Sequence, residues 1–215
     1  IAFIPLSLPV AWLIDKYGYR KAVSVGAILM GIFGVLRGLA GTNYSFVLLS
    51  TIGIAIAQPF LLNAWTTVPA KWFRKEERAT IVGLITLANL VGTGLGMVIT
   101  PILYENGTPI PTIQLIYGSI AAFSALIFII FARENPPTPP CSPEEQVRAF
   151  MLDGLKHAIK VKPFLMFLIV SFIGMGIFNG VTTWIERIIQ PRGFTPTEAG
   201  TLGALMLVGG IIGAV

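Results

Sequence analysis

The sequence predicts an all-α integral membrane protein, and three observations carry that prediction. Hydrophobic residues make up 54% of the 215-residue chain and charged residues only 12%, whereas a soluble domain has about 25% charged residues. Apolar runs near the roughly 20 residues that cross a bilayer recur along the chain. These runs lack the strict alternation of a barrel strand, and a helix satisfies its own backbone hydrogen bonds in hydrocarbon. We therefore expect a polytopic helical bundle.

Seven apolar runs are the expected membrane helices, and the first and last of them are incomplete. They span residues 1–14, 22–40, 45–68, 80–103, 112–132, 163–185 and 198–215. The chain has no initiator methionine, and it begins and ends inside an apolar run. We interpret it as an internal fragment of a longer protein with about seven transmembrane helices.

A charged hinge, residues 15–21, joins the first two runs. Gly18 can adopt a positive φ without a Cβ penalty, so the chain can reverse tightly there. Asp15 follows the end of a helix, where the helix dipole disfavours a negative charge. It therefore needs a partner, and the candidates are Arg20, Lys21, the basic residues near Arg78, or the N-terminus of another helix.

Polar side chains inside three of the runs are candidate solute contacts, because polar groups are costly in a membrane helix and usually face a cavity or a partner helix. They are Asn89 and Thr93 in the fourth run, Asn179 and Thr183 in the sixth, and Gln58 and Trp65 in the third. Asn can donate and accept hydrogen bonds and Trp offers a flat apolar face, so such a site suits a neutral polar or partly apolar solute. The alternative is that these groups bond across helices and only hold the bundle together.

Glycines four residues apart indicate places where helix backbones approach closely. The pairs are Gly34/Gly38, Gly92/Gly96, Gly176/Gly180 and Gly209/Gly213. Arg37 is the one clear charge well inside a run. Its long side chain can extend to the membrane interface, or it can bind an anionic group.

Residues 133–162 form a linker that divides the chain into an N-terminal bundle, 1–132, and the start of a second bundle, 163–215. Its four prolines between residues 136 and 140 favour extended chain. Ser142-Pro143-Glu144-Glu145 then has the pattern of a helix N-terminus, and apolar residues follow at helical spacing. We expect an amphipathic helix on the membrane surface or against the bundle.

Lysine and arginine indicate the orientation. Loops 15–21, 71–78 and 133–162 contain twelve of these residues, and the opposite loops contain only Arg187 and Arg192. Basic loops face the cytoplasm, so the first three loops are expected to be cytoplasmic, in a protein of the plasma membrane.

Several classes are excluded. The net charge of +5 is spread over short loops and does not form a nucleic-acid surface. A single cysteine and a single histidine give neither a disulfide nor a metal site, and no catalytic triad or phosphate loop is present. We expect neither enzymatic activity nor a cofactor.

The hinge carries a family resemblance. Ala11-x-x-x-Asp15-Lys16-x-Gly18-x-Arg20-Lys21 resembles the loop between the second and third helices of major facilitator superfamily transporters, with Ala11 where glycine is more usual. The resemblance implies helices two to eight of a twelve-helix carrier, whose halves rock about a central site, and a gating role for the hinge and Arg78. The alternative is an ordinary charged turn, whose basic residues the positive-inside rule alone would supply.

A second resemblance is to the haem and choline carriers named after the feline leukaemia virus subgroup C receptor. The matching segments are Ala57-Gln58-Pro59-Phe60, Lys71-Trp72-Phe73, Glu77-Arg78-Ala79-Thr80, Asn89-x-x-Gly92 with Pro101, and Gly176-x-Phe178. Leu90 and Asn179 stand where that group has Gln and Tyr. A binding site for the choline cation relies on aromatic faces. The resemblance therefore does not imply that this chain has the same substrate as those carriers.

The expected function is transport of a small solute by alternating access. The alternative is a non-transporting receptor or scaffold on the same fold, since fold does not fix function. The expected partners are an unidentified small solute and the lipid bilayer, without nucleic acid, and we expect a monomer.

Overall fold

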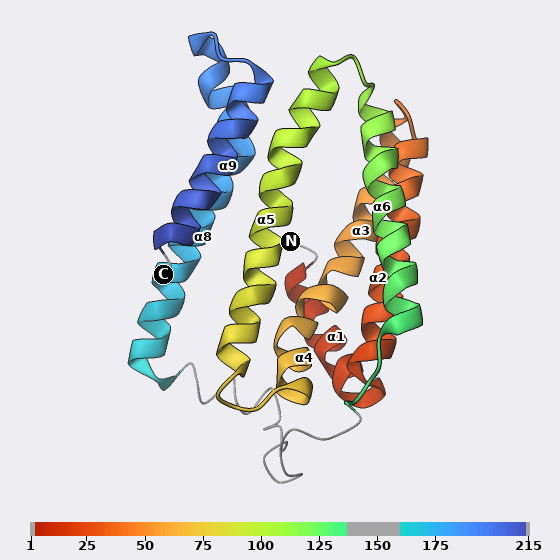
Figure 1. Cartoon of the computed structure of the whole chain (residues 1–215), viewed down its shortest axis with the longest axis vertical. Helices are drawn as coiled ribbons and strands as arrows, with labels where there is room; N and C mark the ends of the chain where they lie inside the picture. The colour runs from red at the N-terminus through yellow and green to blue at the C-terminus, as the bar shows by residue number, and fades with distance from the viewer. Residues whose placement is uncertain (1–2, 137–159, 214–215) are drawn as a thin grey trace. The chain divides into compact units, whose positions relative to one another are not determined.

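The structure is a computed structural model that describes residues 3–136 and 160–213, and helices make up most of both ranges (Figure 1). The elements are α1 (Phe3–Tyr17), α2 (Tyr19–Leu39), α3 (Tyr44–Leu62), α4 (Ala64–Trp72), α5 (Arg78–Glu105), α6 (Ile110–Phe131), α8 (Lys162–Ile189), the short 3-10 helix η2 (Gln190–Arg192) and α9 (Pro196–Gly213). No strand occurs in these ranges. The amphipathic helix expected after Ser142 lies outside the described residues.

Five segments are long and apolar enough to cross a membrane. They are Tyr19–Leu39, Tyr44–Trp72, Arg78–Glu105, Ile110–Phe131 and Lys162–Arg192. The first and last expected helices are shorter: α1 has 15 residues, and the apolar part of α9 is Pro196–Ile212. The all-α polytopic fold is confirmed.

Two junctions differ from the sequence expectation. The seven-residue hinge is mostly helical, because α1 continues to Tyr17 and α2 starts at Tyr19. Only Gly18 interrupts the helices, at a φ of 88°. The third run is divided at Asn63 into α3 and α4, and at this break the Asn63 backbone N–H donates to the Pro59 carbonyl (3.1 Å).

The helices form two compact units. The first comprises Ile1–Asn89 and Leu103–Cys141, and the second comprises Leu90–Ile102 and Ser142–Val215. Helix α5 therefore contributes its middle to the second unit and both ends to the first. Each unit is described by itself.

Glycine allows α2 and α6 to pack backbone against backbone in the first unit. A Cβ on Gly34 would lie 3.0 Å from Cα of Gly118, and one on Gly31 would lie 2.8 Å from Cα of Ala122. Gly38 faces Leu115 at a similar distance. In lipid, where apolar burial adds little, such close contact is a main source of helix association.

The other predicted glycine pairs do not behave in this way. A Cβ on Gly92, Gly96, Gly176, Gly180 or Gly209 would meet nothing within 4 Å. Close packing at these positions is therefore not found among the described residues.

An apolar core closes one end of the first unit. It contains Val10 and Ile14 of α1, Val23 of α2 and Ala64 of α4, all at most 7% exposed. Trp72 and Phe128 pack against this core, so α1, α2, α4 and α6 meet where the hinge reverses the chain.

In the second unit, α8 and α9 are joined by η2 and by Gly193, which has a φ of 86°. Thr195 and Glu198 then form a capping box. The Thr195 N–H donates to the Glu198 carboxylate (2.8 Å), and the Glu198 N–H donates to the Thr195 hydroxyl (3.2 Å). These contacts set where α9 begins.

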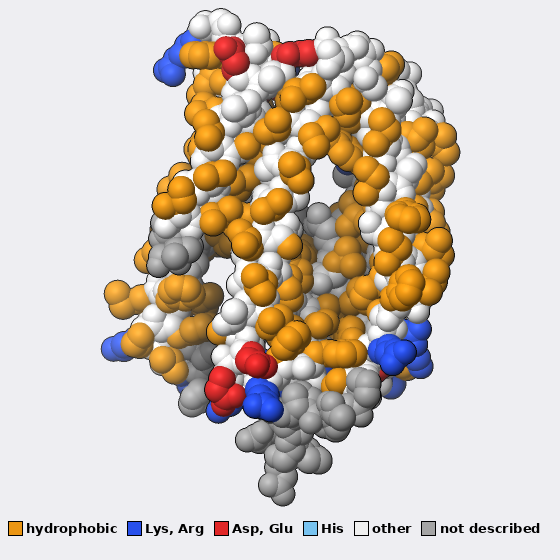
Figure 2. All heavy atoms as spheres, in the orientation of Figure 1, with side chains coloured by type: hydrophobic (Ala, Val, Ile, Leu, Met, Phe, Trp, Pro, Cys, Tyr) orange, Lys and Arg blue, Asp and Glu red, His pale blue; other side chains and the backbone are white. Residues whose placement is uncertain are grey.

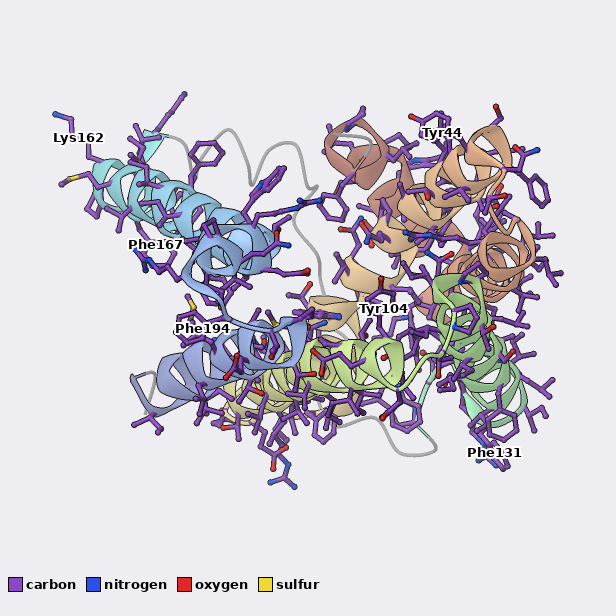
Figure 3. The ribbon with its side chains drawn as sticks, turned by 90° about the horizontal axis from the view of Figure 1, so that it is seen from above. Tyr44, Tyr104, Phe131, Lys162, Phe167 and Phe194 are labelled. Carbon is purple, nitrogen blue, oxygen red and sulfur yellow. The ribbon has the colours of Figure 1, made fainter. Side chains whose placement is uncertain are left out.

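Hydrophobic side chains cover the middle of the helices on the face shown in Figure 2, and charged side chains gather near the helix ends. Aromatic side chains extend outward in Figure 3, such as Tyr44 and Phe131, which are 76% and 74% exposed. So much exposed apolar surface is unusual for a soluble protein, and a bilayer would cover it.

Candidate functional site

The gating residues lie at the ends of helices in the first unit. Asp15 is in the last turn of α1, Gly18 is the N-cap of α2, and Arg20 and Lys21 are in the first turn of α2. Arg78 begins α5, and its Nε donates to the Phe73 carbonyl (3.3 Å). The pairing of Asp15 with Arg20 or Arg78 stays a prediction.

The N-terminus of α2 is capped by a residue far away in the sequence, Glu134. Gly18 has no side chain to cap the helix, and the Glu134 carboxylate accepts from the N–H of Tyr19 (3.1 Å) and of Arg20 (2.7 Å). Exposed N–H groups and the helix dipole favour an anion at this position. Glu134 also forms an ion pair with Lys71.

Tyr19, at the N-terminus of α2, contacts residues of α4 and of the segment after α6. Its hydroxyl donates to the Arg133 carbonyl and accepts from the Trp72 indole (2.9 Å), and the Lys71 ammonium lies 5.4 Å from the centre of its ring. We call Tyr19, Arg20, Lys71, Trp72 and Glu134 the Glu134 cluster. It joins α2, the end of α4 and the residues after α6, so three loops expected on the cytoplasmic side meet at one end of this unit.

The role of Glu134 was not predicted from the sequence. The N-terminus of another helix was a candidate partner for Asp15, whereas the structure places Glu134 at the N-terminus of α2. The signal was the lack of Ser, Thr, Asp or Asn before Tyr19, which leaves the first N–H groups of α2 without a local acceptor. An acid directly after α6 could have been considered for that role.

The candidate solute residues are mostly exposed. Asn89 and Thr93 of α5, Asn179 and Thr183 of α8, and Gln58 of α3 are exposed, and Trp65 of α4 is half-buried. They fall in both units: Gln58, Trp65 and Asn89 in the first, and Thr93, Asn179 and Thr183 in the second. Their convergence on one site is a proposal.

Asn179 and its neighbour Thr182 bond within their own helix. The Asn179 amide donates to the Met175 carbonyl (2.9 Å), and the Thr182 hydroxyl donates to the Phe178 carbonyl (2.8 Å). Bonds of this kind satisfy a polar side chain without joining two helices. The amide oxygen of Asn179 is not used in that bond and lies on an exposed residue.

Ser7 and Asn63 form a polar contact between helices. The Asn63 amide donates to the Ser7 carbonyl (2.9 Å), and the Ser7 hydroxyl donates to the Asn63 side-chain oxygen (3.1 Å). This pair holds α1 to the break between α3 and α4. Asn63 is not among the candidate solute residues, and it forms hydrogen bonds across helices.

Arg37 lies near the end of α2 and is half-buried, and its Nε is buried without a hydrogen-bond acceptor. A positive charge in the last turn is favoured by the helix dipole. The choice between a side chain that extends to the interface and one that binds an anion stays open.

Long apolar helices that bear exposed polar residues and charged ends define a polytopic helical membrane protein. The family model described as Major Facilitator Superfamily matches residues 1–215. The chain belongs to the major facilitator superfamily, a family of carriers and not of enzymes, as the hinge motif indicated.

Named relatives confirm the second resemblance. The choline/ethanolamine transporter FLVCR2 of Homo sapiens is 25% identical over the whole chain and 44% of its own length. Solute carrier family 49 member A3 is 26% identical in Danio rerio and 28% in Xenopus tropicalis, again over the whole chain and over 47% of each relative. The chain thus spans less than half the length of these relatives.

Proposed function

We propose that the complete protein moves a small polar organic solute across a membrane by alternating access. The observation that carries the proposal is the match of the whole chain to a carrier superfamily. The sequence supports it as well, because the linker 133–162 falls where two halves of such a carrier would be joined. Carriers of this kind work by rocking of two halves about a central site.

We place the solute between the helices that carry Asn89/Thr93 and Asn179/Thr183, with Gln58 and Trp65 as further contacts. Five of these six side chains are exposed, which supports the proposal because polar groups in a membrane helix usually face a cavity or a partner helix. No acidic residue is among them. The site therefore suits a solute bound mainly by amide and hydroxyl groups.

Choline and ethanolamine are the first solutes to test, because relatives carry those names. Ethanolamine has a hydroxyl and an amine that Asn side chains can bind, whereas choline also needs aromatic faces. We expect a ligand to raise the melting temperature of the purified full-length protein by an amount that increases with the ratio of its concentration to its Kd, and to be taken up by proteoliposomes. A ligand that binds but is not taken up would favour a receptor over a carrier.

The first prediction concerns Asn89 and Asn179. Replacing either residue with Ala removes a donor and an acceptor, and we expect solute affinity to fall about 10-fold, as a hydrogen bond worth roughly 1.4 kcal/mol implies. The control is Thr112→Ala, an exposed position in the first turn of α6, and this variant should bind the solute normally. Wild-type affinity in both Asn variants, measured by calorimetry, would place the site elsewhere.

A further inference from the structure

Arg37 is a positive charge in the last turn of α2, and the helices around it supply no acid at that end. Helices α1, α3, α4 and α6 pack against α2. Neither residues 16–75 nor residues 106–133 contain an Asp or Glu, and Asp15 of α1 lies beside the start of α2, at the opposite end from Arg37. A partly buried charge is costly without a counter-charge. An anion from outside the chain would therefore stabilise this position.

The side chain of Arg37 is packed against the protein as far as its guanidinium group. Phe33, one turn earlier on the same face of α2, covers Gly53 of α3, where a Cβ would overlap its ring. Arg37 is half-buried, and of its guanidinium nitrogens only Nε is buried without an acceptor. An arginine that extends freely to water keeps its whole charged head there. Arg37 instead holds its two terminal nitrogens at the surface from a packed stem.

The depth of Arg37 in the membrane matches that of lipid headgroups. Arg37 is 16 residues after Lys21, a rise of about 24 Å along an upright helix, and the hydrocarbon core is about 30 Å thick. With Lys21 at the cytoplasmic boundary, the long side chain of Arg37 reaches the opposite boundary. Tyr44 and Tyr104, at the same end of the first unit, are 76% and 53% exposed (Figure 3). Exposed tyrosines are typical of this level of the membrane.

The surface near Arg37 suits a molecule that has acyl chains. Leu39 of α2 and Leu49 of α3, one turn before Gly53, are 63% and 57% exposed. Apolar surface therefore continues from Arg37 on both helices. The candidate solute residues lie on α3, α4, α5 and α8, and none of them is on α2.

We propose that Arg37 binds the phosphate group of a phospholipid in the non-cytoplasmic leaflet, with an acyl chain along Leu39 and Leu49. A guanidinium group can donate two parallel hydrogen bonds to a phosphate, and this pairing is stronger than one between neutral groups. The lipid supplies the negative charge that the surrounding helices lack. The site is separate from the proposed solute site and does not depend on it.

Native mass spectrometry of the purified full-length protein tests the site. Phosphatidylglycerol is the probe, because its headgroup has a phosphate but no amine that a site for choline or ethanolamine would bind. Arg37→Gln should raise the Kd of one bound phosphatidylglycerol about 10-fold, as loss of a charged hydrogen bond implies. Diacylglycerol with the same acyl chains lacks the phosphate, and its binding should not change in Arg37→Gln.

The matched control is Arg192→Gln, which removes the same charge from an exposed position of η2 on the same expected side of the membrane. Its Kd for phosphatidylglycerol should equal that of the wild type. Equal losses in the two variants would mean general attraction of an anionic lipid and would overturn the site, as would a wild-type Kd in Arg37→Gln. Inorganic phosphate should not displace the lipid, and displacement at equal concentration would indicate a site for a soluble anion instead.

Arg37→Lys covers the case in which Arg37→Gln does not fold. Lysine keeps the charge but cannot form the paired hydrogen bonds, so we expect a Kd raised roughly 3-fold, as for one ordinary hydrogen bond. A wild-type Kd in Arg37→Lys would contradict recognition by the guanidinium group. None of these measurements uses solute uptake, so failure of the carrier proposal would not affect them.

Discussion

Gly18 and Glu134 depend on each other at the scale of single residues. Gly18 has a φ of 88°, which favours glycine, and a Cβ there would lie 2.6 Å from the Glu134 carboxyl group. The absence of a Cβ at Gly18 thus permits the positive φ of the turn, and it also leaves the space that the Glu134 carboxyl group occupies. The carboxylate in turn supplies the cap that glycine cannot provide. Glycine at the hinge is required by tertiary structure as well as by local geometry.

Replacing Glu134 with Gln should destabilise the first unit. The variant keeps the shape of the side chain but loses the charge that faces Lys71 and the N-terminus of α2, so we expect a loss of about 1–3 kcal/mol. Thermal unfolding of the purified protein measures the effect. Lys71→Gln should cost less in the Glu134→Gln background than in the wild type, since the ion pair is already lost; purely additive effects would argue against a coupled pair.

Asp15→Asn tests the predicted latch at the hinge. If the Asp15 carboxylate holds Arg20 or Arg78 on the cytoplasmic side, its loss should weaken that contact by roughly 1–3 kcal/mol. Transport rates should change while expression and melting temperature stay near wild type, because the effect is on the balance of conformations. Lys75→Gln, a nearby change of charge outside the latch, is the control. Unchanged transport kinetics in Asp15→Asn would count against the latch.

At the scale of helices, a glycine is informative only together with the helix it faces. Gly34 and Gly38 pack against α6, which offers Gly118 and Ala122 in return, whereas Gly92 and Gly176 have the same spacing and no close neighbour. Spacing within one helix could therefore not identify the contacts. A search for small residues on both partners, including alanine, would have favoured α2 and α6.

Gly118→Val should be strongly destabilising. Its Cβ would overlap the backbone of Gly34, which cannot move aside as a side chain can, and we expect a cost of about 1–3 kcal/mol or a failure of the protein to fold. Gly83→Val is the matched control, because it makes the same change on α5 where nothing lies within 4 Å. Equal melting temperatures for the two variants would mean that the α2–α6 contact contributes little to stability.

For the whole molecule, the sequence predicted where the helices lie better than it predicted which helices contact each other. The apolar runs predicted where the helices lie, because membrane helices must be long and apolar. The motif in the hinge, residues 15–21, indicated the family. The break at Asn63 and the cap by Glu134 could not be predicted, since each depends on residues far apart in the sequence: Asn63 on Ser7, and Glu134 on Tyr19 and Lys71. The solute site is the least determined part, because its six residues belong to two units.

Orientation is the last prediction, and it concerns the whole chain. Twelve Lys and Arg residues lie in three loops expected to be cytoplasmic, and residues of all three loops meet at the Glu134 cluster, so we expect these loops to share one side of the membrane. Cys141 belongs to the linker on that side, outside the described residues. An impermeant maleimide added to intact cells should therefore leave Cys141 unlabelled and label it only after permeabilisation.

The control for orientation is Asn106→Cys in a Cys141→Ser background. Asn106 is exposed in the turn between α5 and α6, at the opposite end of both helices from the basic loops. It should react in intact cells, which shows that the protein is at the cell surface and that the reagent reaches it. Labelling of Cys141 and protection of the Asn106→Cys thiol in intact cells would invert the topology.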